Sequence, residues 1–195
     1  MIPKDWQPET MIGPDTIKKY RELVEQWVPD GGAILEIGSF HGGSIAALAD
    51  IIKRKGLIVV ACDMWDEAPN PAPGILTEEV WKQKREGMLE KFWENMKRNG
   101  LCQHIQVYDR KDGRIGLTAT VDAIGRRINL IFIDGGHTYD AAKVDIAEAK
   151  ELVVPGGLIC GHDYGPDFPG VIQAVDEAFG PRPIDHATTL WSQTQ

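Results

Sequence analysis

Two stretches decide the fold: residues 33–44, which read AILEIGSFHGGS, and residues 57–63, which read LIVVACD. Each contains a short apolar run without regular alternation, which is typical of a strand buried on both faces of a parallel sheet. Between them, Ser44–Lys55 has helical spacing, with basic residues in its last turn and Gly56 at its end. The segment therefore predicts a strand–helix–strand unit.

The same alternation continues on both sides of this unit. Helical spacing predicts one helix over Pro14–Val28 and another over Thr77–Asn99, which Gly87 would weaken or split. Further strands are expected at 104–108, 128–133 and 158–160, further helices at 117–126, 139–152 and 170–179, and one or two short strands in 182–195. The pattern predicts a single α/β domain over residues 1–195, with helices on both faces of a parallel sheet. Residues 66–99 are an insertion that forms either a lid, an acceptor pocket or only a packing element.

Composition limits the class of partner. The chain of 195 residues carries a formal net charge of −8, which disfavours nucleic acid and anionic membranes as partners. No apolar run approaches the roughly 20 residues that span a bilayer, and residues 1–10 lack the apolar stretch of a signal peptide. The three scattered cysteines match neither a disulfide framework nor a zinc site. We therefore expect a cytoplasmic protein.

Polar or glycine residues follow every predicted strand. These segments are Gly38–Gly42, Asp63–Trp65, Asp109–Arg110, Asp134–His137 and His162–Tyr164. Ligands of parallel α/β sheets bind at the carboxyl ends of the strands. We therefore expect these segments to form one site.

The loop after the first strand has the spacing G-x-x-x-G rather than the G-x-G-x-x-G of nicotinamide enzymes, which argues against a dehydrogenase. Its glycines allow a tight turn and a close approach of the backbone to a ligand. Asp63, at the end of the next strand, is placed to accept the hydroxyl groups of a ribose, although an acid there can also simply cap a turn. Glu36 has a structural alternative too, because it can anchor the loop by accepting backbone N–H bonds.

Residues 35–44 and 62–65 resemble the S-adenosylmethionine-dependent methyltransferases of the seven-stranded, Rossmann-like class, also called class I. That resemblance implies a doubly wound sheet of about seven strands in the order 3-2-1-4-5-7-6, with the last strand antiparallel. Residues 131–139, IFIDGGHTY, and residues 155–164, PGGLICGHDY, narrow it to small O-methyltransferases related to macrolide-sugar methyltransferases and cephalosporin-hydroxylase-type proteins. The resemblance covers roughly residues 10–191.

The resemblance implies S-adenosylmethionine as the cofactor and, as the acceptor, a hydroxyl group of a small molecule such as a glycosylated or phenolic metabolite. It places the methionine part of the cofactor on the glycine loop, the ribose on Asp63, the adenine beside Met64 or Trp65, and the adenine amino group on Asp109. The implied cofactor-binding residues are Glu36, Gly38, Ser39, Gly42, Ser44, Asp63, Met64, Trp65, Asp109 and Asp134.

The expected catalytic residues follow the fourth and fifth strands. An alcohol is a poor nucleophile, so methyl transfer to it needs a base or a metal ion. The resemblance implies that Asp134 and His137 are catalytic, with His137 as the base, and that Asp134 and Asp163 hold a divalent cation such as Mg²⁺ or Mn²⁺. His162 departs from the family, because metal-dependent relatives usually have an acid there. It is either a third ligand, which favours softer metals, or a core residue in a metal-free site.

A second hypothesis belongs to another functional class. A catalytically silent protein that binds S-adenosylmethionine, or an assembly protein, would keep the cofactor loop and tolerate the departure at His162. The sequence identifies neither the acceptor nor the oligomeric state, and a homo-oligomer is one alternative.

Overall fold

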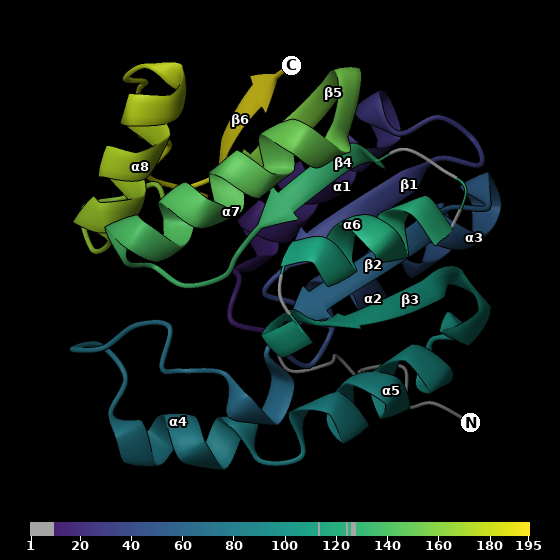
Figure 1. The fold of residues 1–195 in the computed structure, drawn as a ribbon, viewed down its shortest axis with the longest axis horizontal. Coiled ribbons are helices and arrows are strands. Elements are labelled where there is room, and N and C mark those ends of the chain that lie inside the picture. Colours follow the sequence, from purple (N-terminus) through teal and green to yellow (C-terminus); the bar gives the residue numbers. More distant parts are fainter. Residues whose placement is uncertain (1–9, 113, 124, 126–127) are drawn as a thin grey trace.

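The computed structural model describes residues 10–112, 114–123, 125 and 128–195. The described strands form one sheet of six in the order β3-β2-β1-β4-β5-β6 (Figure 1). Their bounds are β1 Ala33–Ile37, β2 Ile58–Asp63, β3 Ile105–Asp109, β4 Ile128–Ile133, β5 Val153–Gly161 and β6 Trp191–Thr194. The α-helices are α1 Pro14–Trp27, α2 Gly43–Ala47, α3 Ala49–Lys55, α4 Glu78–Arg85, α5 Met88–Arg98, α6 Arg114–Ala123, α7 Tyr139–Leu152 and α8 Pro169–Phe179.

The sheet agrees with the predicted class. The first five strands pair in parallel, and β6 pairs with β5 in the antiparallel direction. The described chain has six strands rather than about seven, because residues 180–190, between α8 and β6, form loops and turns. The Rossmann-like order and the reversed last strand are as expected.

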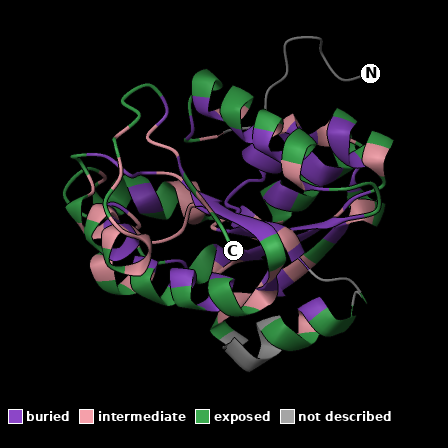
Figure 2. Cartoon of the chain, turned by 90° about the horizontal axis from the view of Figure 1, so that it is seen from above, coloured by how far each residue is buried: buried purple, intermediate pink, exposed green. Residues whose placement is uncertain are grey.

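Each face of the sheet carries its own apolar core. Ile34 and Phe132 point to the face that α1, α2, α3 and α5 cover, whereas Leu35 and Ile131 point to the face that α6, α7 and α8 cover. Successive side chains of a strand alternate between faces, so a strand buried on both sides has apolar residues throughout. Figure 2 shows the result, with buried strands enclosed by helices whose outer sides are exposed.

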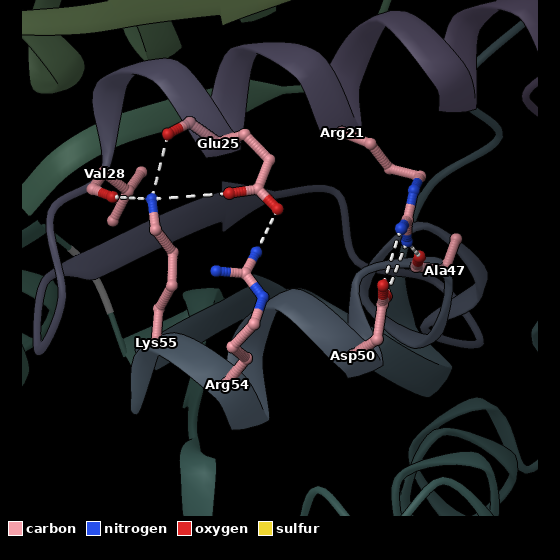
Figure 3. A network of polar contacts seen from close by, with 7 residues as sticks. All are labelled: Arg21, Glu25, Val28, Ala47, Asp50, Arg54 and Lys55. Carbon is pink, nitrogen blue, oxygen red and sulfur yellow. Dashed lines mark hydrogen bonds and ion pairs between the residues drawn. The ribbon is translucent and has the colours of Figure 1, made fainter.

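Polar contacts fix α1 against α3 at the surface (Figure 3). The guanidinium of Arg21 donates to both carboxylate oxygens of Asp50 at 2.7 and 2.8 Å. Arg54 pairs with Glu25, and the Lys55 ammonium donates to the Glu25 carbonyl oxygen at 2.9 Å. Exposed ion pairs of this kind contribute little free energy of folding, so the network orients the helices more than it stabilises them.

Three predicted helices differ from their observed bounds by more than one residue. The expected helix over residues 44–55 is two helices, α2 and α3, which meet at Leu48. The expected helix over residues 77–99 is split near Gly87 into α4 and α5, as this glycine led us to expect; Gly87 has a φ of 63° and is the N-cap of α5. The predicted helix over residues 117–126 begins earlier, as α6, and its end includes positions outside the described residues. Residues 1–9, for which we expected no signal peptide, also lie outside them.

None of the described helices combines the length and the apolar character that a bilayer crossing requires.

Candidate active site

A cavity of about 780 Å³ opens at the carboxyl ends of the central strands. The strand ends contribute Gly38, Ser39, Phe40, Gly43, Ser44, Asp63, Met64, Arg110, Asp134, Gly135, Gly136, His137, His162 and Asp163. The insertion contributes Ala68, Pro69, Asn70, Pro71, Ala72, Ile75, Leu76 and Trp81. The rest of the lining includes Thr10, Met11, Ile12, Thr138, Asp140, Ala141, Val144, Asp145 and Phe168. A cavity of this size is typical of small-molecule and cofactor sites.

Hydrogen bonds beyond the strand ends hold the lining loops together. The Gly38 N–H donates to the Cys62 carbonyl oxygen at 2.8 Å, and the Asp134 N–H donates to the Ile37 carbonyl oxygen at 2.8 Å. The His162 N–H donates to the Ile133 carbonyl oxygen at 3.0 Å. The loops after β1, β4 and β5 therefore continue the ladder of the sheet, which places their side chains at one edge.

Gly38 permits the close contact between two of these loops. Its φ is 88°, and a Cβ atom at this position would lie 2.1 Å from the carbonyl oxygen of Asp134. Any side chain would therefore push the glycine loop away from the loop after β4. This accounts for a glycine at the first position of the predicted motif.

Asp63 joins the glycine loop to the end of β2. Its Oδ2 atom accepts the Phe40 N–H at 2.8 Å, and its Oδ1 atom accepts the N–H groups of Met64 and Trp65 at 2.7 and 3.2 Å. Burial raises the pKa of Asp63, and these hydrogen bonds oppose that shift. The carboxylate also lines the cavity. The turn-capping role considered from the sequence is thus present, and it leaves lone pairs on the carboxylate for a ligand.

Glu36 lies behind the loop and does not line the cavity. The Ser44 hydroxyl, which does line it, donates to Glu36 Oε1 at 2.7 Å, and the Tyr20 hydroxyl lies 3.5 Å from Oε2. Burial raises the pKa of Glu36 to about 8. The side chain therefore positions Ser44 through a hydroxyl contact, rather than through the backbone N–H bonds of the anchoring alternative.

The predicted catalytic residues meet in the loops after β4 and β5, which line the same cavity. His137 Nε2 lies 2.8 Å from Asp163 Oδ2, and His162 Nδ1 lies 3.0 Å from Asp163 Oδ1. His162 Nδ1 is also 3.5 Å from Asp134 Oδ1. One ligand atom each from Asp134, His162 and Asp163 lies within 4.8 Å of the others, a spacing that a cation can bridge.

The charges of this cluster depend on one another. Burial lowers the pKa of His162, but its contacts with Asp134 and Asp163 outweigh burial and raise the pKa to about 10. Burial by itself would raise the pKa of Asp163, but hydrogen bonds from His137 and His162 hold that pKa well below the usual range. Without a metal ion, His162 is therefore an imidazolium between two carboxylates at neutral pH.

Besides Glu36, three more predicted cofactor residues do not line the cavity: Trp65, Asp109 and Gly42. Trp65 has a φ of 51° and turns into the core, where its Nε1–H donates to the Tyr108 carbonyl oxygen at 3.2 Å. Asp109 pairs instead with Lys111 at 3.0 Å. Gly42 packs against α5, where a Cβ atom would lie 2.7 Å from Met96. Of the two residues proposed beside the adenine, Met64 lines the cavity.

Two acidic lining residues on α7, Asp140 and Asp145, were not predicted, and Arg110 was expected at this edge only as part of the Asp109–Arg110 segment. Arg110 follows β3 and pairs with Asp145 at 2.5 Å and with Glu148 at 2.8 Å, both on α7. Burial raises the pKa of Asp145 to about 6 despite its pairing with Arg110. The position of Arg110 directly after a strand indicated that it lies at this edge of the sheet. Nothing in the sequence indicated that Asp145 and Glu148 pair with it.

The insertion contacts the catalytic loop directly. The His137 N–H donates to the Pro71 carbonyl oxygen at 3.2 Å, and the Trp81 Nε1–H donates to the Ala68 carbonyl oxygen at 2.8 Å. Trp81 is buried, and it also lines the cavity. Residues 68–76 therefore form one wall of the site.

Comparison with known proteins identifies the family. Residues 35–164, more than half of the chain, match a family model described as a methyltransferase domain. The chain belongs to this methyltransferase family. The matched range begins in β1 and ends just after Asp163, so it contains the glycine loop, Asp63 and the His137 cluster of this methyltransferase.

Solved structures of O-methyltransferases share the fold of this methyltransferase. NovP is 19% identical, with a TM-score of 0.63 over 86% of this chain and 72% of its own. CalS11, a calicheamicin methyltransferase, is 15% identical, with a TM-score of 0.65 over 91% and 76%; its apo structure is described as a TDP-rhamnose 3′-O-methyltransferase. An O-methyltransferase from Bacillus cereus in complex with S-adenosylhomocysteine is 20% identical, with a TM-score of 0.56 over 88% and 70%. At these identities the likeness establishes the fold.

Proposed function

We propose that this methyltransferase transfers a methyl group from S-adenosylmethionine to a hydroxyl group of a small molecule, such as a phenolic or glycosylated metabolite. One observation carries the proposal: the Gly38 loop with Asp63 and the His137–Asp163 pair line the same cavity. A cofactor and an acceptor that occupy it together would meet between these groups. The cofactor of the Bacillus cereus structure supports the choice of methyl donor.

The lining residues fit this cofactor. Gly38 lets its loop pack closely against the loop after β4, and Ser39, Gly43 and Ser44 present a polar loop to the cavity. The carboxylate of Asp63 keeps acceptor capacity for the ribose hydroxyls, and Met64 offers an apolar contact for the adenine. When bound, S-adenosylmethionine supplies a methyl group on a positively charged sulfur atom. We propose Gly38, Ser39, Ser44, Asp63 and Met64 as cofactor-binding residues, with Glu36 behind Ser44.

His137 is the proposed general base. With its Nε2–H held by Asp163, the lone pair of the ring lies on Nδ1, which has no hydrogen-bond partner in the described part of the chain. Removal of the acceptor proton at Nδ1 would make the hydroxyl oxygen nucleophilic as the methyl group transfers. Nδ1 is buried, so an acceptor reaches it only after the surrounding loops rearrange. Residues 66–77, which contact His137 through Pro71, are the part of the 66–99 insertion that we propose as a lid.

Asp134, His162 and Asp163 are the proposed ligands of a divalent cation, Mg²⁺ or Mn²⁺. Two carboxylates suit either ion, and an imidazole favours Mn²⁺ of the two. The ion would orient the acceptor hydroxyl and stabilise its developing negative charge. Binding of the ion through His162 requires the imidazolium to lose a proton, which Asp134 and Asp163 stabilise in the metal-free cluster. Asp134 would thus bind the cation and also line the part of the cavity in which the methyl group transfers.

The remaining parts of the proposal concern the setting of the enzyme. A small-molecule acceptor agrees with the acidic net charge of the chain. A cytoplasmic location agrees with three free cysteines, of which Cys62 and Cys160 are buried. We propose that residues 10–195 act as a single domain, because both apolar cores share the one sheet.

Calorimetry and methyl-transfer assays test the function in two steps. S-adenosylhomocysteine should bind with a micromolar or lower dissociation constant, while NAD should not bind. A panel of phenols, sugars and glycosides, incubated with S-adenosylmethionine, should then yield a methylated product by mass spectrometry. Binding without methylation of any acceptor would favour the catalytically silent protein, and absence of binding would refute both.

A further inference from the structure

Exposed apolar side chains gather at the mouth of the cavity. In the described part of the chain the exposed large apolar residues are Met11, Ile75, Val80, Trp93 and Val144. Three of them line this one cavity: Met11 at 48% exposure, Ile75 at 58% and Val144 at 52%. They come from the segment before α1, from the insertion and from α7. An apolar rim assembled from three separate segments indicates a binding surface rather than chance exposure.

The ionisable lining of the cavity is predominantly acidic. Its carboxylates are Asp63, Asp134, Asp140, Asp145 and Asp163. Arg110 is the one Lys or Arg among the described lining residues, and Asp145 and Glu148 already pair with it. A cation held by Asp134 and Asp163 would offset those two charges and leave the others. A phosphate or carboxylate group on an acceptor would therefore find no unpaired Lys or Arg among the described lining residues.

The helix terminus at the mouth is also occupied by an acid. The first turn of α7 lines the cavity with Thr138, Asp140 and Ala141, and the Thr138 hydroxyl accepts the Ala141 N–H at 3.3 Å. Asp140, in that first turn, is exposed. A free helix N-terminus attracts anions, but the exposed Asp140 carboxylate opposes this attraction where α7 lines the cavity.

We propose that the acceptor is an uncharged or cationic hydroxylated molecule with an apolar body, which packs on Met11, Ile75 and Val144, and that Asp140 rejects acceptors bearing a phosphate or carboxylate group. This inference rests on the proposed function and narrows its acceptor class. It sets this chain apart from an enzyme that accepts a nucleotide-linked sugar, the substrate in the description of CalS11.

Binding of a matched series of probes tests the proposal. The protein is saturated with S-adenosylhomocysteine and titrated with 4-ethylphenol, tyramine, 3-(4-hydroxyphenyl)propionate and TDP-rhamnose, with ligand-observed NMR at millimolar concentrations. The first three share a phenol ring and differ in charge. 4-Ethylphenol and tyramine should bind at least about tenfold more tightly than the anionic probe, as expected for partly screened charges a few ångströms apart. TDP-rhamnose should not bind.

Variants assign the effect to the named residues. Asp140→Asn should raise the affinity for 3-(4-hydroxyphenyl)propionate roughly three- to tenfold and leave that for 4-ethylphenol unchanged. Asp15→Asn, an exposed acid in the first turn of α1, is the matched control and should change neither. Ile75→Ser and Val144→Ser should each weaken the binding of 4-ethylphenol roughly fivefold, because an apolar contact is lost. Val80→Ser, exposed but outside the cavity lining, should not.

Several outcomes would overturn the inference. Equal or tighter binding of the anionic probe or of TDP-rhamnose would do so while leaving the proposed function intact. Failure of every neutral and cationic probe to bind would also do so. Light scattering tests whether a second copy of the chain packs on the rim instead of an acceptor. A dimer that Ile75→Ser or Val144→Ser dissociates would show that it does. If S-adenosylhomocysteine itself does not bind, the proposed function fails together with the inference.

Discussion

His137 and Asp163 form a pair across two neighbouring loops, with Nε2 of the imidazole 2.8 Å from Oδ2 of the carboxylate. His137 follows β4 and Asp163 follows β5, so the parallel pairing of these strands brings the two side chains together. The second carboxylate oxygen of Asp163 faces His162 at 3.0 Å. Asp163 therefore fixes the orientation of His137 and is itself fixed from the other side.

This pair makes His137 the most informative position for catalysis. His137→Ala should lower kcat by about 10²- to 10⁴-fold, the usual effect of removing a general base. The affinity for S-adenosylhomocysteine should stay within about twofold, because the glycine loop and Asp63 are unchanged. Single-turnover kinetics and calorimetry measure the two quantities. An undiminished kcat, or joint loss of cofactor binding and folding, would show that His137 is structural.

Asp63 and Asp109 allow a matched test of cofactor binding. The two acids stand opposite each other in the register of β2 and β3, but only Asp63 lines the cavity. Asp63→Asn should weaken the affinity for S-adenosylhomocysteine by roughly 10- to 100-fold, because it removes hydrogen bonds to a charged acceptor, and such bonds contribute about 1.5–3 kcal/mol. Asp109→Asn should leave the affinity unchanged. Because Asp63 also accepts three backbone N–H groups, melting curves must show that Asp63→Asn stays folded. Equal affinities of the two variants would remove Asp63 from the ribose site.

The strands were predictable because their signal is local. A short and nearly all-apolar run such as residues 128–133 favours a strand buried on both faces, and the polar residues that follow each run mark the carboxyl edge. Asp134, His137 and Asp163 were therefore brought together correctly. Trp65 and Asp109 were not, although they also follow strands. The direction of a side chain after a strand depends on the next turn, and the positive φ of Trp65 sends its indole into the core.

Contacts between distant segments left no such signal. Arg110 lines the cavity because Asp145 and Glu148 on α7 hold it there, and nothing near Arg110 in the sequence indicates that pairing. The apolar rim is similar, since Met11, Ile75 and Val144 meet only after folding. The tail shows the reverse limit: of the one or two strands expected there, one forms, because residues 180–190 contain two prolines, which restrict strand pairing.

Metal dependence follows from the Asp134–His162–Asp163 cluster. Exhaustive treatment with EDTA should lower methyl transfer by at least about tenfold, and Mn²⁺ or Mg²⁺ should restore it. The affinity for S-adenosylhomocysteine should persist after chelation, because the glycine loop and Asp63 hold that molecule. Asp134→Asn should abolish the response to added metal. Full activity of a metal-free preparation would instead mean that the His162 imidazolium stabilises the developing negative charge.

Gly38 offers a test of the contact between the glycine loop and the loop after β4. Gly38→Ala places a Cβ atom 2.1 Å from a backbone oxygen at a φ of 88°, so we expect about 3 kcal/mol of destabilisation or more. Gly56→Ala is the matched control, with a φ of 62° and open space around the new Cβ, and should cost only about 1 kcal/mol. Urea unfolding measures both. Similar losses in the two variants would refute the close contact at Gly38.

Glu36 predicts how stability responds to pH. Its pKa is about 8 in the folded chain, against an ordinary value of 4.5, because burial disfavours the carboxylate. Between these values the folded state retains a proton that the unfolded state has lost, so this group lowers the free energy of unfolding progressively as pH rises from about 4.5 to 8. Glu36→Gln keeps an acceptor for the Ser44 hydroxyl and removes the titration. The variant should therefore gain stability relative to the wild type across this interval, by up to a few kcal/mol, and the difference should level off above pH 8. Urea unfolding at pH 5, 7 and 8.5 measures the difference, and Glu22→Gln on the exposed side of α1 controls for the loss of a surface carboxylate. A difference that is constant over this interval would mean that Glu36 is ionised in the folded protein. Its partners Ser44 and Tyr20 would then stabilise a buried charge rather than a neutral acid.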